Sequence, residues 1–343
     1  MNMAKRKYSK SSKIEPSVQT MTFLIQATDT GKEFNFIDLS QCASLLNRRF
    51  YRQGINWAVS SFKILSGSGV TGEVTIGKLP NTWVMSNAWE KAFRAWQKMN
   101  NEALAESPSV KPKFLDFKIY ANKDHHVNGY SRNLLPYSSA SVATPAIQAV
   151  VGEWEPSKLR IPDTTVLGNT REREMIAVGA SYPGNGASGL NAVSLIEGYA
   201  ASRGLPNVLD PNTPDDSADA DGIAPENWMS ALFNQGTEQT DEVIQDMISE
   251  NNLAPYPFEN DGTHTDTQYP GGANNLPTLE IHDQEYITST TIGGTTRLKG
   301  GNFPCGLIGI GTNALRVDDV ILLQVNLVPG THRGYLCEPM TEM

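Results

Sequence analysis

The chain has 343 residues and a formal net charge of −9, and its 39% of hydrophobic residues can form a sizeable core in one large domain or two ordinary ones. Three cysteines, far apart and without a CxxC pair, exclude a simple disulfide framework and a thiolate zinc site. No apolar run approaches the roughly 20 residues of a membrane-spanning helix, and no apolar segment follows the first cations as a secretory signal requires.

The first 20 residues are polar and predict a flexible basic arm. Its cations and one tyrosine can neutralise phosphates and stack on a base: Lys5, Arg6, Lys7, Tyr8, Lys10 and Lys13. The same residues also fit a solvated tail or a nuclear localisation signal, and these roles can coexist. A second basic group, Arg48, Arg49 and Arg52, either contacts nucleic acid or forms ion pairs with acidic neighbours.

Short apolar runs at hairpin spacing predict strands near both ends of the chain. We expect these strands at Met21–Gln26, Phe34–Leu39, Ile55–Leu65, Val70–Ile76, Phe114–Tyr120, Lys158–Ile161, Glu174–Gly179, Thr278–Thr291, Thr295–Lys299, Cys305–Ile310 and Val317–Val328. Ile55–Leu65 and Val70–Ile76 flank a glycine-rich turn, which predicts an antiparallel hairpin.

Helical patterns are fewer and lie between the strands. Ser40 is the expected cap of a short helix that ends near Arg49. Ser86 is the expected cap of the helix Asn87–Glu106, which should turn Trp89, Phe93 and Trp96 towards the core. Three further helices are expected: Leu190–Ser202, Trp228–Phe233 and Glu238–Asn251.

The segment from Gly204 to Thr296 contains 17 acidic residues and no Lys or Arg. A chain that is basic at one end and acidic in a later block indicates two surfaces that face two environments. Strands at both ends, without regular helical crossovers, predict an all-β fold, a single sandwich with elaborated loops. We therefore expect an arm at 1–20 and a sandwich domain at 21–343 that carries an acidic, loop-rich insertion at about 204–277.

Two motifs suggest other chemistry. Gly184-x-Gly186-x-x-Gly189 has the spacing of a dinucleotide-binding loop, but loop rather than a second βα unit follows it. Four close carboxylates are weak candidates for an irregular calcium site, although they do not fit the EF-hand spacing: Asp215, Asp216, Asp219 and Asp221. No histidine pair or nucleophile motif forms a catalytic pattern, so we expect neither an enzyme nor a cofactor.

Several sequence runs are similar to capsid proteins of small circular Rep-encoding single-stranded DNA viruses. These runs are Phe36-Ile37-Asp38-Leu39-Ser40, Asn47-Arg48-Arg49-Phe50-Tyr51-Arg52-Gln53-Gly54, Lys78-Leu79-Pro80-x-Thr82-Trp83, Asn87-Ala88-Trp89-x-Lys91 and Leu327-Val328-Pro329-Gly330-x-x-Arg333-Gly334-Tyr335. The resemblance covers residues 20–120 and 278–337 best and hardly includes the acidic block.

The resemblance implies a single jelly-roll subunit, an icosahedral homo-oligomeric shell and an arm directed at a packaged genome, expected to be single-stranded DNA. The expected locations are the virion and, during assembly, the host nucleus, without membrane insertion. Two other classes stay open: a jelly-roll glycan-binding protein, which would explain the loops and tryptophans, and an NAD-type enzyme, which would use the Gly184–Gly189 loop.

Overall fold

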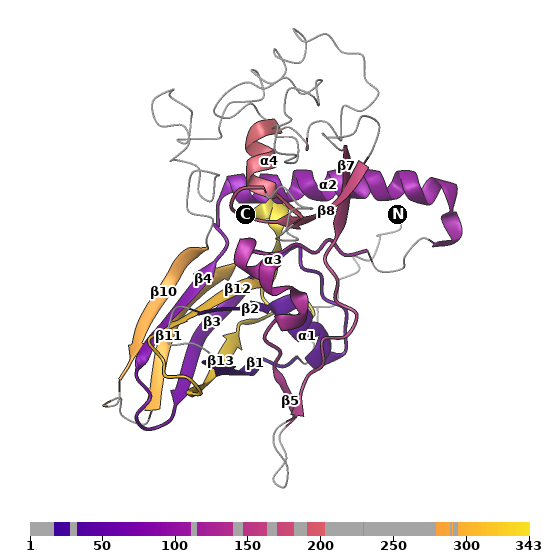
Figure 1. Cartoon of the computed structure of the whole chain (residues 1–343). Coiled ribbons are helices and arrows are strands. Elements are labelled where there is room, and N and C mark those ends of the chain that lie inside the picture. Colours follow the sequence, from indigo (N-terminus) through magenta and orange to yellow (C-terminus); the bar gives the residue numbers. More distant parts are fainter. Residues whose placement is uncertain are drawn as a thin grey trace, which may run out of the picture.

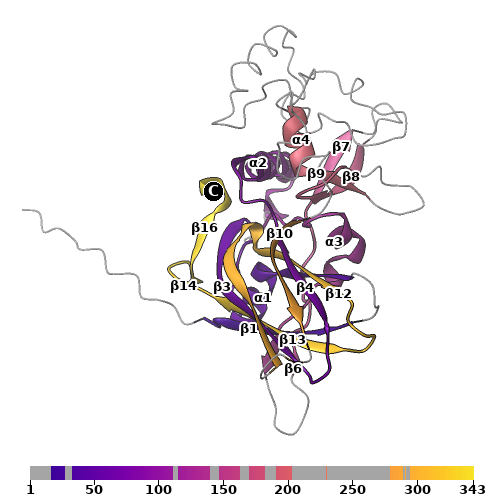
Figure 2. The ribbon, with the colours of Figure 1, turned by 90° about the vertical axis from the view of Figure 1, so that its left-hand side faces the viewer.

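The computed structural model describes residues 17–27, 33–110, 115–139, 147–162, 170–181, 191–202, 229, 279–288, 290 and 294–343. Eight of its strands, four in each of two antiparallel sheets, form the sandwich, and the short β16 (Cys337–Pro339) adds to the first sheet as a fifth strand (Figures 1 and 2). The first sheet has the order β1 (Thr20–Gln26), β13 (Val320–Leu327), β3 (Ile55–Ser66) and β11 (Thr295–Phe303). The second has the order β10 (Glu280–Ile287), β4 (Gly72–Lys78), β12 (Leu307–Asn313) and β2 (Glu33–Asp38).

The pairing of these eight strands is nested. The first strand pairs with the last, the second with the seventh, the third with the sixth and the fourth with the fifth, always antiparallel. One long hairpin has thus been rolled into two facing sheets, which is the jelly-roll topology. The all-β jelly-roll sandwich expected from the sequence is confirmed.

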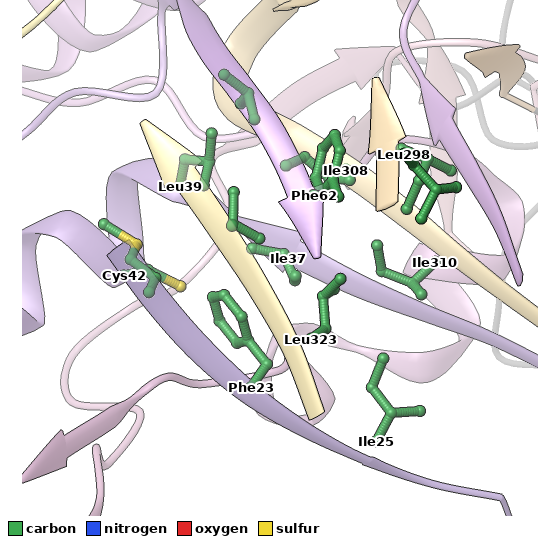
Figure 3. Close-up of a cluster of buried hydrophobic side chains, with 14 of the residues drawn as sticks. Phe23, Ile25, Ile37, Leu39, Cys42, Phe62, Leu298, Ile308, Ile310 and Leu323 are labelled. Atoms are coloured by element: carbon green, nitrogen blue, oxygen red, sulfur yellow. The ribbon is translucent and has the colours of Figure 1, made fainter. Parts of the chain in front are cut away.

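Apolar side chains at alternate positions fill the space between the two sheets (Figure 3). Phe23 and Leu323 come from neighbouring strands of the first sheet, and Ile37 and Ile308 from neighbouring strands of the second. All four are completely buried. Burial of each such side chain contributes about 1.5–3 kcal/mol relative to exposure, which is why the alternating runs were good indicators of strands.

The predicted hairpin between Ile55–Leu65 and Val70–Ile76 is wrong, because β3 and β4 belong to different sheets. Both edges of β3 are already occupied, by β13 on one side and β11 on the other. The glycine-rich turn instead carries the chain across the sandwich, and Gly69 in it has a positive φ of 90° that favours glycine. Burial of both inner faces decides the pairing here, rather than proximity in sequence.

Residues 79–279 form one insertion between β4 and β10. Its ends meet, since Lys78 and Glu280 are paired residues of those two strands. In Figure 1, α2, α4, β7 and β8 lie above the sandwich. The elements of the insertion are α2 (Trp83–Glu106), η1 (Pro108–Val110), α3 (Lys123–Asn128), η2 (Tyr130–Arg132), β5 (Tyr137–Ser139), β6 (Ile147–Gln148), β7 (Lys158–Pro162), β8 (Thr170–Ile176), β9 (Ala192–Ser194) and α4 (Leu195–Ser202).

The insertion has a second apolar core that is built around α2. Trp89 and Trp96 are buried there, Phe93 is partly buried, and all three rings contact Phe117. The inward face predicted for this helix is therefore confirmed. The helix begins four residues earlier than predicted, because Thr82 accepts a hydrogen bond from the Met85 N–H and caps it. The hydroxyl of the predicted cap, Ser86, instead donates to the carbonyl of Met340, at 2.5 Å.

Three other local predictions differ from the structure. The cap of α1 (Leu39–Asn47) is Asp38, not Ser40, because its carboxylate accepts from two backbone N–H groups of the first turn. Residues 115–119 of the predicted strand Phe114–Tyr120 form no strand. The predicted helix Leu190–Ser202 begins only at Leu195, after β9. The predicted helices Trp228–Phe233 and Glu238–Asn251 lie outside the described residues, apart from Met229.

A buried polar network joins the insertion to the sandwich. The Asp38 carboxylate accepts from the Gln53 amide at 3.0 Å and from the Trp154 indole at 3.1 Å. The Gln53 side-chain oxygen accepts from the Ile119 N–H at 2.7 Å, and the Gln53 N–H donates to Asp116 at 3.2 Å. Burial raises the pKa of Asp38 above its ordinary value and that of Asp116 to about 6. Buried polar groups that satisfy one another in this way fix how the two parts pack.

The C-terminal segment also links the two parts. After the short pair β14 (Pro329–Gly330) and β15 (Gly334–Tyr335), β16 (Cys337–Pro339) adds to β3. Met340, in η6 (Met340–Glu342), then lies buried in the core of the insertion, where its sulfur accepts from the N–H of Cys305 in η5 (Pro304–Gly306). None of the helices in the described ranges is long and apolar enough to cross a membrane.

Candidate nucleic-acid interface

The base of the basic arm is held against the end of the sandwich. The six predicted phosphate- and base-binding residues of the arm, Lys5 to Lys13, lie outside the described residues, which begin at Ser17. The Ser17 hydroxyl and the Gln19 amide both donate to the carbonyl of Gly334, at 3.1 and 3.2 Å. The Val18 N–H donates to the side-chain oxygen of Asn47 at 2.9 Å. These bonds set the place from which the arm leaves the sandwich.

A buried tyrosine organises this anchor. Tyr335 is fully buried, donates its hydroxyl to the Val18 carbonyl at 2.7 Å and accepts from the Asn47 amide at 2.8 Å. Its ring packs against Tyr51 and Trp57, with ring centroids 5.5 and 5.3 Å away. Burial raises the pKa of Tyr335 to about 12, so the hydroxyl stays a hydrogen-bond donor over the whole physiological range.

Four arginines surround this anchor, and we call them the arginine cluster: Arg48, Arg49, Arg52 and Arg333. Arg48 directly follows Asn47, and Arg333 directly precedes Gly334. Arg333 contacts the carbonyl of Phe50, and the guanidinium of Arg52 lies over the Phe50 ring, 5.4 Å from its centroid. The basic group predicted from Arg48, Arg49 and Arg52 is thus joined in the fold by a fourth arginine.

Two of these arginines, Arg333 and Arg52, act electrostatically on His332. Burial lowers the pKa of His332, and the positive charges of Arg333 and Arg52 lower it further. In the part of the chain that the structure describes, no carboxylate lies within ion-pair distance of Arg48, Arg52 or Arg333, and all three are exposed. Of the two alternatives for Arg48 and Arg52, a direct ion pair is therefore not found among the described residues, although the charge of Arg52 acts on the Asp116 carboxylate and lowers its pKa.

Two members of the cluster have strained backbones. Arg48 ends α1 with a left-handed conformation, φ 52° and ψ 40°, and Arg333 has a φ of 51°. Glycine is the usual residue at such a helix end because it adopts this conformation without a steric cost. Strain of this kind is concentrated at functional sites. The positive charge at the two positions is thus present at a cost in stability.

The two other candidate sites from the sequence, the glycine motif and the group of four carboxylates, lie outside the described residues. Gly184, Gly186 and Gly189 lie outside the described residues, and the segment after them is β9, which pairs in parallel with β8 before α4 begins at Leu195. A dinucleotide site needs the glycine turn to lead directly into a helix, so the described flanks lack that order. Asp215, Asp216, Asp219 and Asp221 also lie outside the described residues. Among the residues that are described, no three His, Cys, Asp or Glu side chains gather closely enough to hold a metal ion.

Comparison of the chain with protein-family models, with curated proteins and with solved structures finds no match. The jelly-roll assignment therefore depends on strand order and register alone, and function has to be inferred from the site. Arg333 and the Asn47–Tyr335 anchor were not predicted as part of that site, because Arg333 and Phe50 are 283 residues apart in sequence. The one available signal was that Asn47 and Arg333 both lie in runs for which a resemblance to viral capsid proteins is predicted from the sequence.

Proposed function

We propose that this protein is a capsid protein similar to those of small circular Rep-encoding single-stranded DNA viruses. Copies of it would assemble into an icosahedral shell, with the basic arm and the arginine cluster facing a packaged single-stranded genome. The jelly roll occurs both in viral capsid proteins and in lectins, so the fold alone does not distinguish these classes. The feature that favours the capsid is the basic arm, whose base is anchored beside Arg48 and Arg333, two exposed arginines that form no ion pair with the described residues.

The distribution of charge supports the same proposal. The acidic, Lys- and Arg-free segment begins just after α4, and 14 of its 17 acidic residues precede β10; the other three, Glu280, Asp283 and Glu285, lie in β10. In Figures 1 and 2, α4 lies at the top, above α2, whereas β1, which continues from the arm, lies in the lower half of both views. Packaging of a polyanion favours cations on the genome side, and carboxylates there would repel phosphate.

The decisive experiment is assembly of the purified full chain. Negative-stain microscopy and size exclusion should give uniform megadalton particles that contain nucleic acid. A small species that binds no nucleic acid would contradict the capsid proposal. If that small species were retained on immobilised glycans, the jelly-roll glycan-binding alternative would replace it.

The role of the arm is tested by a variant that keeps its length. Lys5, Arg6, Lys7, Lys10 and Lys13 are changed together to Gln, and a control variant changes three serines of the same arm, Ser9, Ser11 and Ser12, to Ala. The Gln variant should form shells with less nucleic acid and show a flatter dependence of binding on salt, by roughly 0.7 log unit for each lost phosphate contact on a single strand. Equal nucleic-acid content in the two variants would show that the arm is not a genome contact.

The acidic segment supplies a second test. Residues 205–275 are predicted to face outward, so limited proteolysis of intact particles should cut there before it cuts the sandwich. Chelation should change the cutting rate only if Asp215, Asp216, Asp219 or Asp221 binds a divalent ion. Protection of this segment in intact particles, with cutting only after disassembly, would contradict the proposed orientation.

A further inference from the structure

The outer face of the β1–β13–β3–β11 sheet carries three cations, and we call it the basic sheet face. Arg297 of the edge strand β11 is the direct cross-strand partner of Lys63 in the adjacent strand β3. Lys299 lies two residues along β11, on the same face, opposite Ser61. Arg297 and Lys299 are exposed and Lys63 is half-buried. The inward neighbours of these residues, such as Phe62 and Leu298, belong to the core.

All other outward positions of the four strands are uncharged. They are Thr20, Thr22, Leu24, Gln26, Ser61, Leu65, Thr295, Val320, Leu322, Gln324 and Asn326. Hydrogen bonds run across one row of this face: Thr20 donates to Asn326 at 2.8 Å, and Asn326 donates to Ser61 at 3.1 Å. No ion pair between described residues involves Lys63, Arg297 or Lys299. The face is therefore positively charged along β3 and β11 and carries polar and aliphatic side chains elsewhere.

The fold itself gains nothing from this arrangement. Like charges directly opposite each other on a sheet face are destabilising, and here a third cation lies on the adjacent diagonal. A carboxylate at Gln324 or Ser61, the cross-strand neighbours, would relieve the repulsion, but neither position has one. The Asp283 carboxylate of the neighbouring β10 accepts from the backbone N–H of Lys299 at 2.7 Å, but among the described residues it forms no ion pair with any of the three cationic groups. An anionic ligand with several charges would compensate all three cations at once. The missing partner is thus expected to come from outside the subunit.

We infer that the basic sheet face binds the sugar–phosphate backbone of nucleic acid, independently of base sequence and separately from the arm. This inference rests on the proposed function. A nucleic acid is favoured over another polyanion because the basic arm runs directly into β1, which is a strand of this same sheet. The outward positions of the four strands include no aromatic residue, so base stacking does not contribute and recognition is by charge and hydrogen bonding.

The test compares two triple variants with equal charge. Lys63→Gln, Arg297→Gln and Lys299→Gln neutralise the basic sheet face, while Lys98→Gln, Lys123→Gln and Lys158→Gln remove three cations from the insertion. Affinity of the full chain for an oligo-dT strand is measured against salt concentration. The sheet-face variant should lower the log–log salt slope by about 2, because each lost contact on a single strand accounts for roughly 0.7. The insertion variant should keep the slope of the unmodified protein.

Each outcome has one meaning. Equal slopes for the two variants, with both folded by circular dichroism, would overturn the inference. Loss of binding to a heparin fragment with unchanged binding to oligo-dT would also overturn it, and would assign the face to a sulfated glycan. If the unmodified chain forms no particles, but the log–log salt slope of oligo-dT binding decreases in the sheet-face variant alone, the capsid proposal is contradicted. The inference that the basic sheet face binds nucleic acid is then still supported. If particles assemble normally and the sheet-face and insertion variants have equal salt slopes, only the inference about the basic sheet face is contradicted, and the capsid proposal is unaffected.

Discussion

Two buried titratable side chains at the junction of sandwich and insertion should give the fold opposite responses to acid. Burial raises the pKa of Asp116 from 3.8 to about 6 and lowers that of His125 from 6.5 to about 4. The His125 ring is held neutral between the Ala121 N–H, from which it accepts at 3.0 Å, and the Asn133 side-chain oxygen, to which it donates at 2.8 Å. The folded chain therefore binds a proton more tightly at Asp116, and less tightly at His125, than the unfolded chain does.

The sign follows for each group. Stability from Asp116 is fully present below its unfolded pKa and is lost as the pH rises through about 6. Stability from His125 is present above pH 6.5 and is lost as the pH falls towards 4. At 1.36 kcal/mol per pKa unit, acidification from pH 7.5 to 4.5 adds about 2 kcal/mol through Asp116 and removes about 3 kcal/mol through His125. The contributions of Asp116 and His125 to the free energy of unfolding nearly cancel in the unmodified chain. Substitution of one residue should therefore expose the pH dependence that the other one causes.

Asp116→Asn and His125→Gln separate the two contributions. Urea unfolding of dilute subunits, followed by tryptophan fluorescence at pH 4.5 to 7.5, gives the free energy of unfolding for each variant and for the unmodified chain. Relative to the unmodified chain, Asp116→Asn should lose about 2 kcal/mol on acidification, and His125→Gln should gain about 3 kcal/mol. His332 also titrates with a shifted pKa, but it is present in all three proteins and cancels in the differences. Asp38 raises the pKa of Asp116, so the Asp116→Asn difference includes the change that this substitution causes at Asp38. Differences that do not vary with pH, or that have the same sign for both variants, would refute this reasoning.

Three further predictions concern single side chains. Trp96→Ala should lower the free energy of unfolding by about 3–5 kcal/mol in the same urea assay, since the ring is only 8% exposed, whereas a loss below 1 kcal/mol would contradict its place in the core. Arg48→Gly should raise that free energy by about 0.5–1 kcal/mol by relieving the left-handed backbone and should weaken binding to oligo-dT; unchanged binding would remove Arg48 from the interface. Tyr335→Phe should cost about 1–2 kcal/mol and speed amide exchange at Val18, because the hydroxyl that holds the base of the arm is lost; unchanged exchange would show that this anchor is unimportant.

The strands of the sandwich could be predicted because each one buries one face. Alternation in β1 and β13 follows directly from side chains that point in turn to the core and to solvent. Their partners could not be predicted, since β3 pairs with strands more than 200 residues away and ignores the nearby β4. The predictions of the helix caps were wrong for a similar reason. Ser40 and Ser86 are residue types that commonly cap helices, but Asp38 and Thr82 cap these two helices instead, and the Ser86 hydroxyl bonds to Met340.

The candidate nucleic-acid interface could likewise be predicted only in part from the sequence. Arg48, Arg49 and Arg52 could be recognised as a basic group from sequence alone, whereas Arg333 joins them only because the C-terminal segment returns beside α1. The basic sheet face was not visible in the sequence at all, since Lys63 and Arg297 are paired by register and not by proximity. Local patterns thus report burial and charge, but only the fold shows which charges meet.

The meeting of Lys78 and Glu280 at the two ends of the insertion has a consequence for the order in which the chain folds. To pair β4 with β10 directly, a flexible chain must close a loop of residues 79–279, which costs roughly 3 kcal/mol more than a four-residue turn, at about 0.6 kcal/mol for each doubling of length. An insertion that has already packed α2 against α4 and β7 brings residues 79–202 together and leaves a shorter loop to close, which lowers that cost. We therefore expect folding to begin in the insertion and then to proceed outward through the nested pairs. The pairing of β1 with β13 would come last, so the base of the arm would take its final place only in a finished subunit.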